Sequence, residues 1–154
     1  MMTALPSPAQ VSDQALPLFE QAFQRGWLYR LSTFLFRRSY QLKELGQTLC
    51  CARVQNSAYA GAYPVEIKQI QGTESKAADF DGHFHPRRQQ SRSRWLEVAV
   101  ERLRGRDLPP VELVEVDGIY YVRDGHHRIS VARTLGQQFI DAEVIRMSLD
   151  QRDF

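Results

Sequence analysis

Residues 120–132 read YYVRDGHHRISVA: a short strand pattern ends in Asp124-Gly125 and is followed at once by a helical pattern. Glycine has no Cβ, so it accepts a positive φ and allows a ligand to approach the backbone closely. The first N–H groups of a helix lack partners within the helix, and the helix dipole makes that end positive. A strand that turns through glycine into a helix is therefore typical of an anion site. We expect this turn to bind a phosphate group.

The side chains of residues 124–128, named here the DGHHR box, and those near it add donors for phosphate. Arginine has a fork of N–H donors that matches phosphate oxygens, and histidine adds imidazole donors. An alternative for the two histidines is an ordinary helix start with one exposed and one packed imidazole. We predict a ligand-binding set made of Arg123, Gly125, His126, His127, Arg128 and Ser130.

Two interpretations are open for Asp124. Asp is one of the preferred N-cap residues, so its role could be to cap the helix that follows. In the functional interpretation its carboxylate binds Mg²⁺ or orients a nucleophile. We predict Asp124 as a catalytic and metal-binding residue, with Asp81 as a second catalytic carboxylate.

The residues around the box indicate a small α+β domain over 63–147. A polar stretch at 71–88 is longer than the loops of compact domains usually are, which favours a functional role. Asp117-Gly118 is typical of a tight hairpin. The other elements follow from periodicity and from helix start and stop residues: strands at 64–70, 111–116, 119–122 and 140–146, and helices at 91–104 and 126–135.

The segment before this domain, residues 12–53, is predicted to be helical. Leucine and phenylalanine recur there at spacings of three and four, without the alternation of a strand. We expect two or three amphipathic helices, with a break at Gly26. Residues 54–62 carry no periodic pattern and are predicted to be a connector.

The middle of the helical segment has no acidic residue between Gln21 and Lys43, and its basic residues alternate with aromatic ones. Such a helix could lie on a membrane surface or bind a partner. Aromatic residues at helical spacing more often belong to the core, and we expect this here. The aromatic residues concerned are Trp27, Tyr29, Phe34 and Phe36.

Four arginines crowd the start of the helix predicted at 91–104, where the helix dipole favours acidic residues instead. They are Arg87, Arg88, Arg92 and Arg94. One interpretation is a second contact to an anion, and we assign Arg87 and Arg88 to the nucleotide ligand on this basis. A contact between the Arg87–Arg94 cluster and nucleic acid is the second interpretation. A solvated basic face is the third.

The overall composition narrows the class of protein. The chain has 154 residues, 43% hydrophobic and 25% charged, which fits a compact domain with its own core. Its net charge of +2 excludes a polycation that coats DNA through bulk charge. The first residues do not have the pattern of a signal peptide, and no apolar run is long enough to span a membrane. We expect a cytoplasmic protein.

The DGHHR box resembles the box of the ParB/sulfiredoxin superfamily, in which a glycine, two variable residues and an arginine open a helix. The surrounding residues agree with this resemblance, which covers about 63–147. They are Leu108-Pro109-Pro110-Val111, the Asp117-Gly118 hairpin and Gly136, and also Ile70-Gln71-Gly72 and Asp79-Phe80-Asp81, which resemble the ligand-side loop of bacterial ParB-domain proteins.

The resemblance implies a ParB/sulfiredoxin-like fold, a small mixed sheet with helices, and a nucleotide ligand (CTP, ATP or ADP) with Mg²⁺. Partition proteins of this superfamily bind and hydrolyse CTP with magnesium, and their pattern would place Gly125 and Arg128 on the phosphates. Those proteins carry a helix-turn-helix domain after this one. We expect no such domain in residues 148–154 of this sequence. Sulfiredoxins have a catalytic cysteine where this chain has His126, so sulfiredoxin chemistry is excluded.

A further branch, the ParB-like free-serine kinases, uses an acidic residue as a base toward a small hydroxyl compound, a role that Asp124 or Asp81 could fill. The favoured hypothesis is therefore a nucleotide-handling enzyme, either an NTPase or a small-molecule phosphotransferase. The alternative is a noncatalytic regulatory or nucleic-acid-binding module. A homodimer is compatible with both hypotheses. The sequence offers no paired-carboxylate cluster for a two-metal nuclease.

Overall fold

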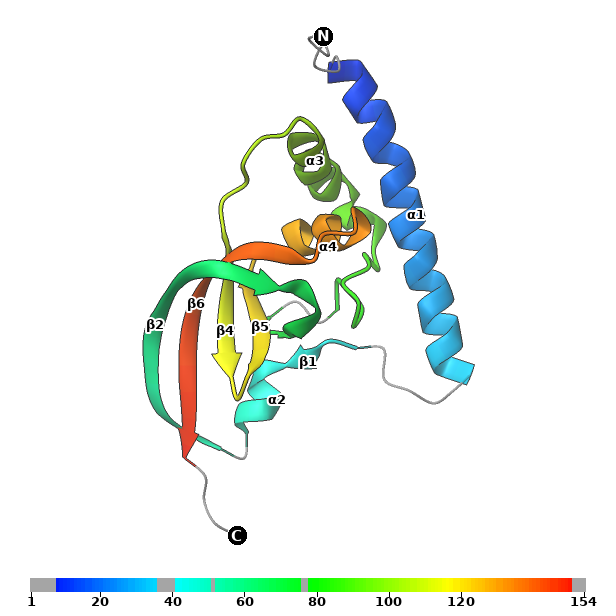
Figure 1. The fold of residues 1–154 in the computed structure, drawn as a ribbon. Coiled ribbons are helices and arrows are strands. Elements are labelled where there is room, and N and C mark those ends of the chain that lie inside the picture. Colours follow the sequence, from blue (N-terminus) through cyan, green and yellow to red (C-terminus); the bar gives the residue numbers. More distant parts are fainter. Residues whose placement is uncertain (1–7, 36–40, 51, 76–77, 151–154) are drawn as a thin grey trace.

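The computed structural model of the chain describes residues 8–35, 41–50, 52–75 and 78–150 (Figure 1). It is an α+β fold in which six strands form one mixed sheet, preceded by a long N-terminal helix, and this confirms the predicted class. The elements are α1 (Pro8–Leu35), β1 (Lys43–Glu44), α2 (Leu45–Leu49), β2 (Arg53–Glu66), η1 (Ile67–Gln69), β3 (Ile70–Thr73), η2 (Gln89–Ser91), α3 (Arg92–Leu103), β4 (Val111–Val116), β5 (Ile119–Asp124), α4 (His126–Thr134) and β6 (Phe139–Asp150).

The strands lie in the order β1-β3-β5-β4-β6-β2. β4 and β5 form the predicted hairpin at the centre, and the turn between them has Asp117 at φ 51° and Gly118 at φ 77°. Two successive positive φ values are those of a type I′ turn, whose twist matches the paired strands. β3 pairs parallel to β5 and β6 pairs parallel to β4, so the hairpin is covered on both edges.

β2 includes the whole of residues 54–62, so the prediction of a connector there is wrong. The strand pairs antiparallel with β6 along its full length, from Arg53 opposite Asp150 to Glu66 opposite Phe139. Most of its first residues are exposed, because β2 lies at the edge of the sheet. An edge strand that packs little against a core needs no apolar alternation, and the sequence shows none.

The strand predicted at 64–70 is divided in two. β2 ends at Glu66, a 3₁₀ turn follows, and β3 begins at Ile70. Ile67 and Ile70 would lie on opposite faces of a continuous strand, yet both are buried in the same core cluster because the 3₁₀ turn brings them to one side. The backbone N–H of Ile67 donates to the carbonyl of Gln138 at 2.9 Å. This bond fixes the corner to the loop between α4 and β6.

α1 is one continuous helix through Gly26, so the predicted break there is wrong, although residues 12–53 do contain two helices, α1 and α2. Glycine inside a helix costs about 1 kcal/mol relative to alanine. Gly26 is nevertheless buried, and a Cβ at this position would lie 2.7 Å from the Cβ of His85. The absence of a side chain at Gly26 therefore lets the loop around His85 pack closely on α1.

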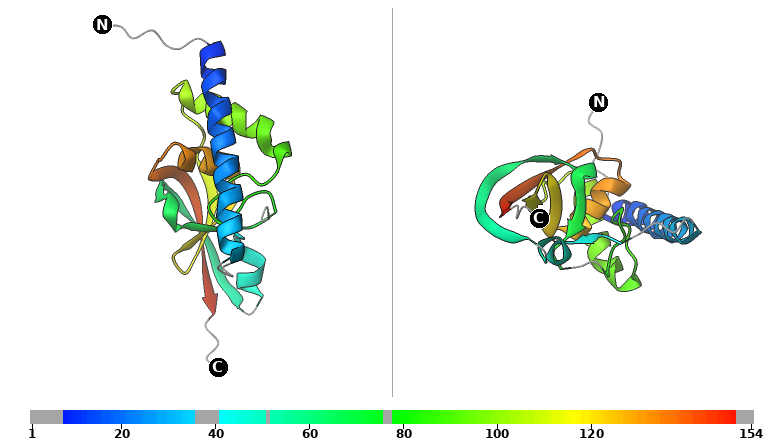
Figure 2. Two further views of the ribbon diagram at one scale, coloured as in Figure 1. Left: turned by 90° about the vertical axis from the view of Figure 1, so that its right-hand side faces the viewer. Right: turned by 90° about the horizontal axis from the view of Figure 1, so that it is seen from below.

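The N-terminal half of α1 packs on α3 and α4 through Ala15, Phe19 and Ala22, which form a core cluster with Trp95 and Ala99 of α3. Figure 2 shows α1 outermost, with α3 and α4 between it and the sheet. Helices α3 and α4 occupy 92–103 and 126–134, within one residue of the predicted bounds at each end.

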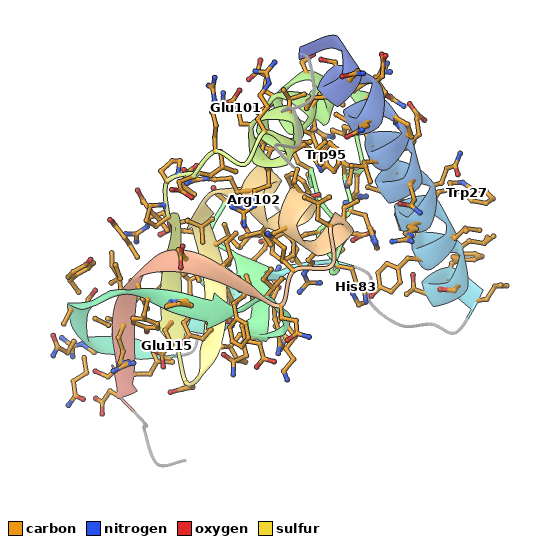
Figure 3. All side chains as sticks on the ribbon, turned by 45° about the horizontal axis from the view of Figure 1, so that its top comes forward. Trp27, His83, Trp95, Glu101, Arg102 and Glu115 are labelled. Carbon is orange, nitrogen blue, oxygen red and sulfur yellow. The ribbon has the colours of Figure 1, made fainter. Side chains whose placement is uncertain are left out.

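The C-terminal half of α1 presents apolar side chains to solvent, so the expectation that its aromatic residues belong to the core is wrong for two of them. Trp27 is 57% exposed and Phe34 is 79% exposed, and Trp27 points away from the rest of the molecule (Figure 3). Tyr29 is half-buried instead, with its ring 4.4 Å from that of His83. Phe36 lies outside the described residues. Within the described ranges, no helix is long and apolar enough to span a membrane.

Candidate functional site

The turn that was predicted to bind phosphate connects β5 to α4 through Gly125. This residue has φ 100°, a left-handed value that strains side chains other than glycine. A Cβ at Gly125 would also lie 2.5 Å from Cγ1 of Val111 on β4. The sequence suggested that glycine keeps space for a ligand. The structure adds a second reason, because the turn packs directly on the neighbouring strand.

Arg128 is largely buried, with 14% of its side chain exposed, and its donors are directed at the protein. Nη1 donates to the backbone carbonyls of Pro109 at 2.5 Å and Pro110 at 2.7 Å. Nη2 donates to the carboxylate of Asp124 at 2.6 Å. Arg128 therefore ties α4 to the segment that enters β4, which the resemblance to ParB boxes did not indicate.

Asp124 is the last residue of β5, and Gly125 occupies the N-cap position of α4. The interpretation of Asp124 as the helix N-cap is therefore wrong, and its carboxylate bonds to Arg128 instead. The Asp124 side chain is 60% exposed, so its carboxylate remains accessible to a ligand or a metal ion.

The two histidines of the box differ in their surroundings, in line with the alternative of one packed and one more exposed imidazole. His126 is buried, and its Nε2 lies 2.7 Å from the Thr73 hydroxyl at the end of β3. Its ring stacks on Phe80 at 5.8 Å. His127 is only half-buried, and its ring meets Phe80 edge to face at 5.2 Å. His126 therefore fixes the start of α4 to the sheet, whereas His127 stays partly open to solvent.

Arg123 and Ser130 bond to other residues of the protein. Both Nε and Nη2 of Arg123 donate to the Glu74 carboxylate, at 2.8 and 3.1 Å, and this hydrogen bonding lowers the pKa of Glu74. The buried Ser130 hydroxyl accepts a hydrogen bond of 2.9 Å from the indole Nε1 of Trp95. These contacts join β5 to β3 and α4 to α3, and they give both residues a structural role.

A pocket of about 310 Å³ lies at the N-terminal end of α4. It combines the positive end of the helix with Arg94, which reaches it from the first turn of α3, and with the exposed Asp124. The other lining residues are Val98, Leu108, Pro109, Gly125, His126, His127 and Arg128. The structure thus brings four residues of the predicted ligand set together with Asp124.

The rest of the predicted set lies elsewhere. Arg123, Ser130, Arg87, Arg88 and Asp81 do not line this pocket. Asp81 is fully buried and faces α1, where its carboxylate lies 3.9 Å from Arg30. Its assignment as a catalytic partner of Asp124 stays a prediction that this geometry does not favour.

The arginine cluster before and within α3 is partly neutralised by acidic residues. The Arg87 backbone N–H donates to the carbonyl of Asp79, which anchors the approach to α3. A nucleic-acid interface built from this cluster stays a prediction, but exposed ion pairs are compatible with a solvated basic face. The pairs join Arg88 to Asp79 (3.2 Å), Arg92 to Glu20 (3.9 Å) and Arg94 to Glu97 (3.2 Å).

Sequence reasoning missed Arg94 as a residue of the box pocket and the buried partners of the box, Thr73 and Trp95. Arg94 was noticed only as a member of a basic cluster, because its position opposite α4 depends on how the two helices pack. Thr73 follows the Ile70-Gln71-Gly72 motif directly, so this position was the available indication.

Comparison with known proteins adds little. No protein family model matches the chain. No curated protein matches it at a significant level. Among solved structures, sulfiredoxin from Arabidopsis thaliana matches with 20% sequence identity and a TM-score of 0.40, over 56% of this chain and 86% of that one. Neither an activity nor a ligand is transferred from a likeness of this size.

Proposed function

We propose that the protein binds the phosphates of a nucleotide, CTP, ATP or ADP, in the pocket at the N-terminal end of α4. The observation that carries this proposal is the pocket itself, which Arg94 of α3 lines together with the start of α4 at Gly125, His126 and His127. The positive end of a helix dipole and a guanidinium group together favour phosphate.

The size of the pocket limits which part of the nucleotide it holds. Ligand pockets span about 300–1,000 Å³, and this one, at about 310 Å³, lies at the small end. We therefore assign it to the phosphates, with the sugar and base over its rim. Arg94 is the principal cation in this proposal, since its side chain is 72% exposed and its bond to Glu97 is an exposed pair within one helix. Such pairs contribute about 0.3–0.5 kcal/mol, so a phosphate can replace Glu97.

Arg128 has a different part in the proposal. Its donors hold Pro109, Pro110 and Asp124, so it positions the wall of the pocket and the carboxylate. Its charge still lies beside the bound phosphates. Removing it would therefore disturb the pocket through the loss of structure as well as through the loss of charge.

Asp124 fits the role of a ligand to Mg²⁺. Magnesium in nucleotide sites is usually bound through one or two carboxylates together with phosphate oxygens and water. Asp124 is exposed at the edge of the pocket, and it is the one carboxylate among the described lining residues. When bound, the ion would supply neutralisation of the phosphate charge. The chain's own contribution is to hold the Asp124 carboxylate beside the helix start, through its bond to Arg128.

Two versions of this function differ in whether the nucleotide is consumed. The enzyme version needs a group that orients the nucleophile, and we assign this role to His127 because it lines the pocket. The noncatalytic version is favoured by the bond between Asp124 and Arg128, which gives both charged residues a structural role. A regulatory module needs the same phosphate contacts and no turnover.

The binding step can be tested by thermal unfolding with CTP, ATP, ADP and GTP, with and without Mg²⁺. A ligand that binds the native state raises the midpoint, by about 2.7 kcal/mol of stability at a hundredfold excess over Kd. Arg94→Gln should reduce this shift. Arg106→Gln is the matched control, because Arg106 also forms an exposed pair with a glutamate but lies outside the pocket. The proposal is contradicted if no nucleotide shifts the midpoint, or if both variants respond as the wild type does.

A further inference from the structure

A second and larger cavity, of about 780 Å³, lies apart from the box pocket. Its walls come from the C-terminal half of α4, the corner between β2 and β3, the 82–85 loop and Arg25 on α1. Figure 3 shows His83 of this loop beside the lower half of α1. The function proposed above does not use this cavity.

The 82–85 loop is fixed by the buried carboxylate of Asp81. Its Oδ1 accepts the backbone N–H groups of His83 at 2.9 Å and His85 at 3.0 Å. The ring nitrogen Nδ1 of His85 lies 3.1 Å from Oδ2 of the same carboxylate. A carboxylate in this position sets the orientation of the imidazole and keeps the proton on Nδ1. The other nitrogen, Nε2, is then left for a ligand in the cavity that His85 lines.

The backbone holds this arrangement at an energetic cost. Phe84 has φ 60°, an uncommon value for a bulky residue, and its side chain is buried in the core. Strained backbone conformations of this kind are concentrated at functional sites. The loop is closed by the hydrogen bond from Asp81 N–H to the His85 carbonyl at 3.1 Å, and Gly26 lets α1 press against it.

The cavity carries excess positive charge. Arg133 lines it from α4, with Nη2 on the carbonyl of Ile67 at 2.9 Å and the guanidinium 5.3 Å from the centre of the Phe84 ring. Among the described residues, its buried Nε has no hydrogen-bond partner. Arg25 adds an exposed guanidinium. Burial lowers the pKa of Arg133, but an arginine stays protonated in proteins.

Two other charged groups change this balance little. Glu66, the one carboxylate among the described lining residues, is paired with Lys68 at 2.5 Å. Burial lowers the pKa of His83, and Arg133 and His85 lower it further against the opposite effect of Asp81. His83 is therefore neutral near pH 7. Among the described residues, the cavity wall offers Arg25 and Arg133 no carboxylate besides the paired Glu66. The buried Asp81 behind the wall acts on Arg133 electrostatically and raises its pKa against the effect of burial.

We propose that this cavity binds a small molecule that carries an oxyanion, either a carboxylate or a phosphate. Arg25 and Arg133 attract the anion, and Nε2 of His85 accepts a hydrogen bond from a hydroxyl group of the same molecule while Asp81 holds the ring. A volume of about 780 Å³ accommodates a metabolite-sized ligand. This site is independent of the nucleotide pocket, since the two share no lining residue.

Calorimetric titrations with inorganic phosphate, citrate and AMP test the proposal on the whole chain. At least one probe should bind the wild type, and Arg25→Gln and His85→Gln should each weaken it by about fivefold or more, as expected for a contact of about 1 kcal/mol. Arg106→Gln, which makes the same change of charge outside both this cavity and the box pocket, should leave that binding within about twofold. Citrate or phosphate as the stronger probe identifies the class of anion.

Binding by no probe overturns the proposal. So does binding that Arg94→Gln weakens and Arg25→Gln does not, because such a probe occupies the pocket at α4. Asp81 depends on His85 as a partner, so His85→Gln could disturb the fold. Arg25→Gln keeps the test decisive in that case, because Arg25 is exposed on α1. Circular dichroism and the unfolding midpoint establish that each variant is folded.

Discussion

The guanidinium of Arg128 and the carboxylate of Asp124 are joined by a hydrogen bond of 2.6 Å across the first turn of α4. The same guanidinium holds the carbonyls of Pro109 and Pro110. The two charged residues of the DGHHR box therefore partly neutralise each other, and a phosphate in the pocket meets an arginine that is already engaged. Substitutions in the box must be judged for stability before they are judged for binding.

Arg128→Ala should destabilise the protein by about 1.5–3 kcal/mol, the usual contribution of hydrogen bonds to a charged group. The reason is that the carbonyls of Pro109 and Pro110 and the carboxylate of Asp124 lose their common donor. Urea unfolding measures the change. Arg106→Ala, which breaks an exposed ion pair, should cost about 0–1 kcal/mol. Equal losses in the two variants would show that Arg128 does not hold the β4 entry.

Gly125→Ala should destabilise the protein more than Gly136→Ala. Both glycines have positive φ, 100° and 73°, so alanine is strained at either position, by about 1 kcal/mol or more. Only at Gly125 would the new Cβ meet another atom closely, Cγ1 of Val111 at 2.5 Å, whereas nothing lies within 4 Å at Gly136. The difference in unfolding free energy between the variants isolates this contact, and we expect about 1–3 kcal/mol for it. No difference would mean that the turn moves away from β4 without cost.

The sequence predicted those elements that depend on local residues. The Asp117-Gly118 turn, the strand at 111–116 and the helix that begins at His126 are where the sequence places them. Their determinants, a turn pair, an apolar run and a glycine before a helix, lie within the elements themselves. The position of the pocket could be predicted too, because the glycine that precedes α4 marks the helix start at which the pocket lies.

The features that sequence reasoning missed depend on distant partners. β2 is a strand because β6 pairs with it, and its own exposed residues carry no alternation. Gly26 is a point of close contact between α1 and the loop at His85 and not a helix break, and the position of that loop cannot be read from the residues of α1. Arg123 binds Glu74 across the sheet, so its assignment to phosphate could not be checked before β3 and β5 were known to be neighbours.

Ser130→Ala should cost about 1–3 kcal/mol, because it leaves the buried indole N–H of Trp95 without its acceptor. A double-mutant cycle with Trp95→Phe tests this contact, since phenylalanine has no N–H to satisfy. The loss caused by Ser130→Ala should fall to about 0.5 kcal/mol or less when residue 95 is phenylalanine. Urea unfolding of the four proteins gives the coupling energy. A loss of the same size in both backgrounds would assign the effect to packing of Ser130 and not to the hydrogen bond.

Glu74→Gln should make the protein less sensitive to mild acid. Hydrogen bonding from Arg123 lowers the pKa of Glu74 below its ordinary value of 4.5. A lowered pKa in the folded state means that the pair stabilises the protein above pH 4.5 and that this stabilisation is lost as the pH falls toward the lowered pKa. The pair is exposed, so the loss is about 1 kcal/mol or less. The free energy of unfolding should therefore fall more between pH 7 and pH 3 in the wild type than in Glu74→Gln. An equal fall in both proteins would contradict the pairing of Glu74 with Arg123.

Asp124→Asn separates the two versions of the proposed function. The amide keeps the shape of the carboxylate, so nucleotide binding should stay within about fivefold of the wild type, the weight of an exposed ion pair. In the enzyme version the loss of the magnesium ligand should lower turnover by on the order of 100-fold or more. The measurement is release of phosphate or diphosphate from CTP, ATP and ADP with Mg²⁺, with serine and other small hydroxyl compounds offered as acceptors. Wild-type release that Asp124→Asn leaves unchanged would remove Asp124 from the chemistry. Binding without any release would assign the protein to the noncatalytic version, because the proposed phosphate contacts at the helix start do not require that a bond be broken.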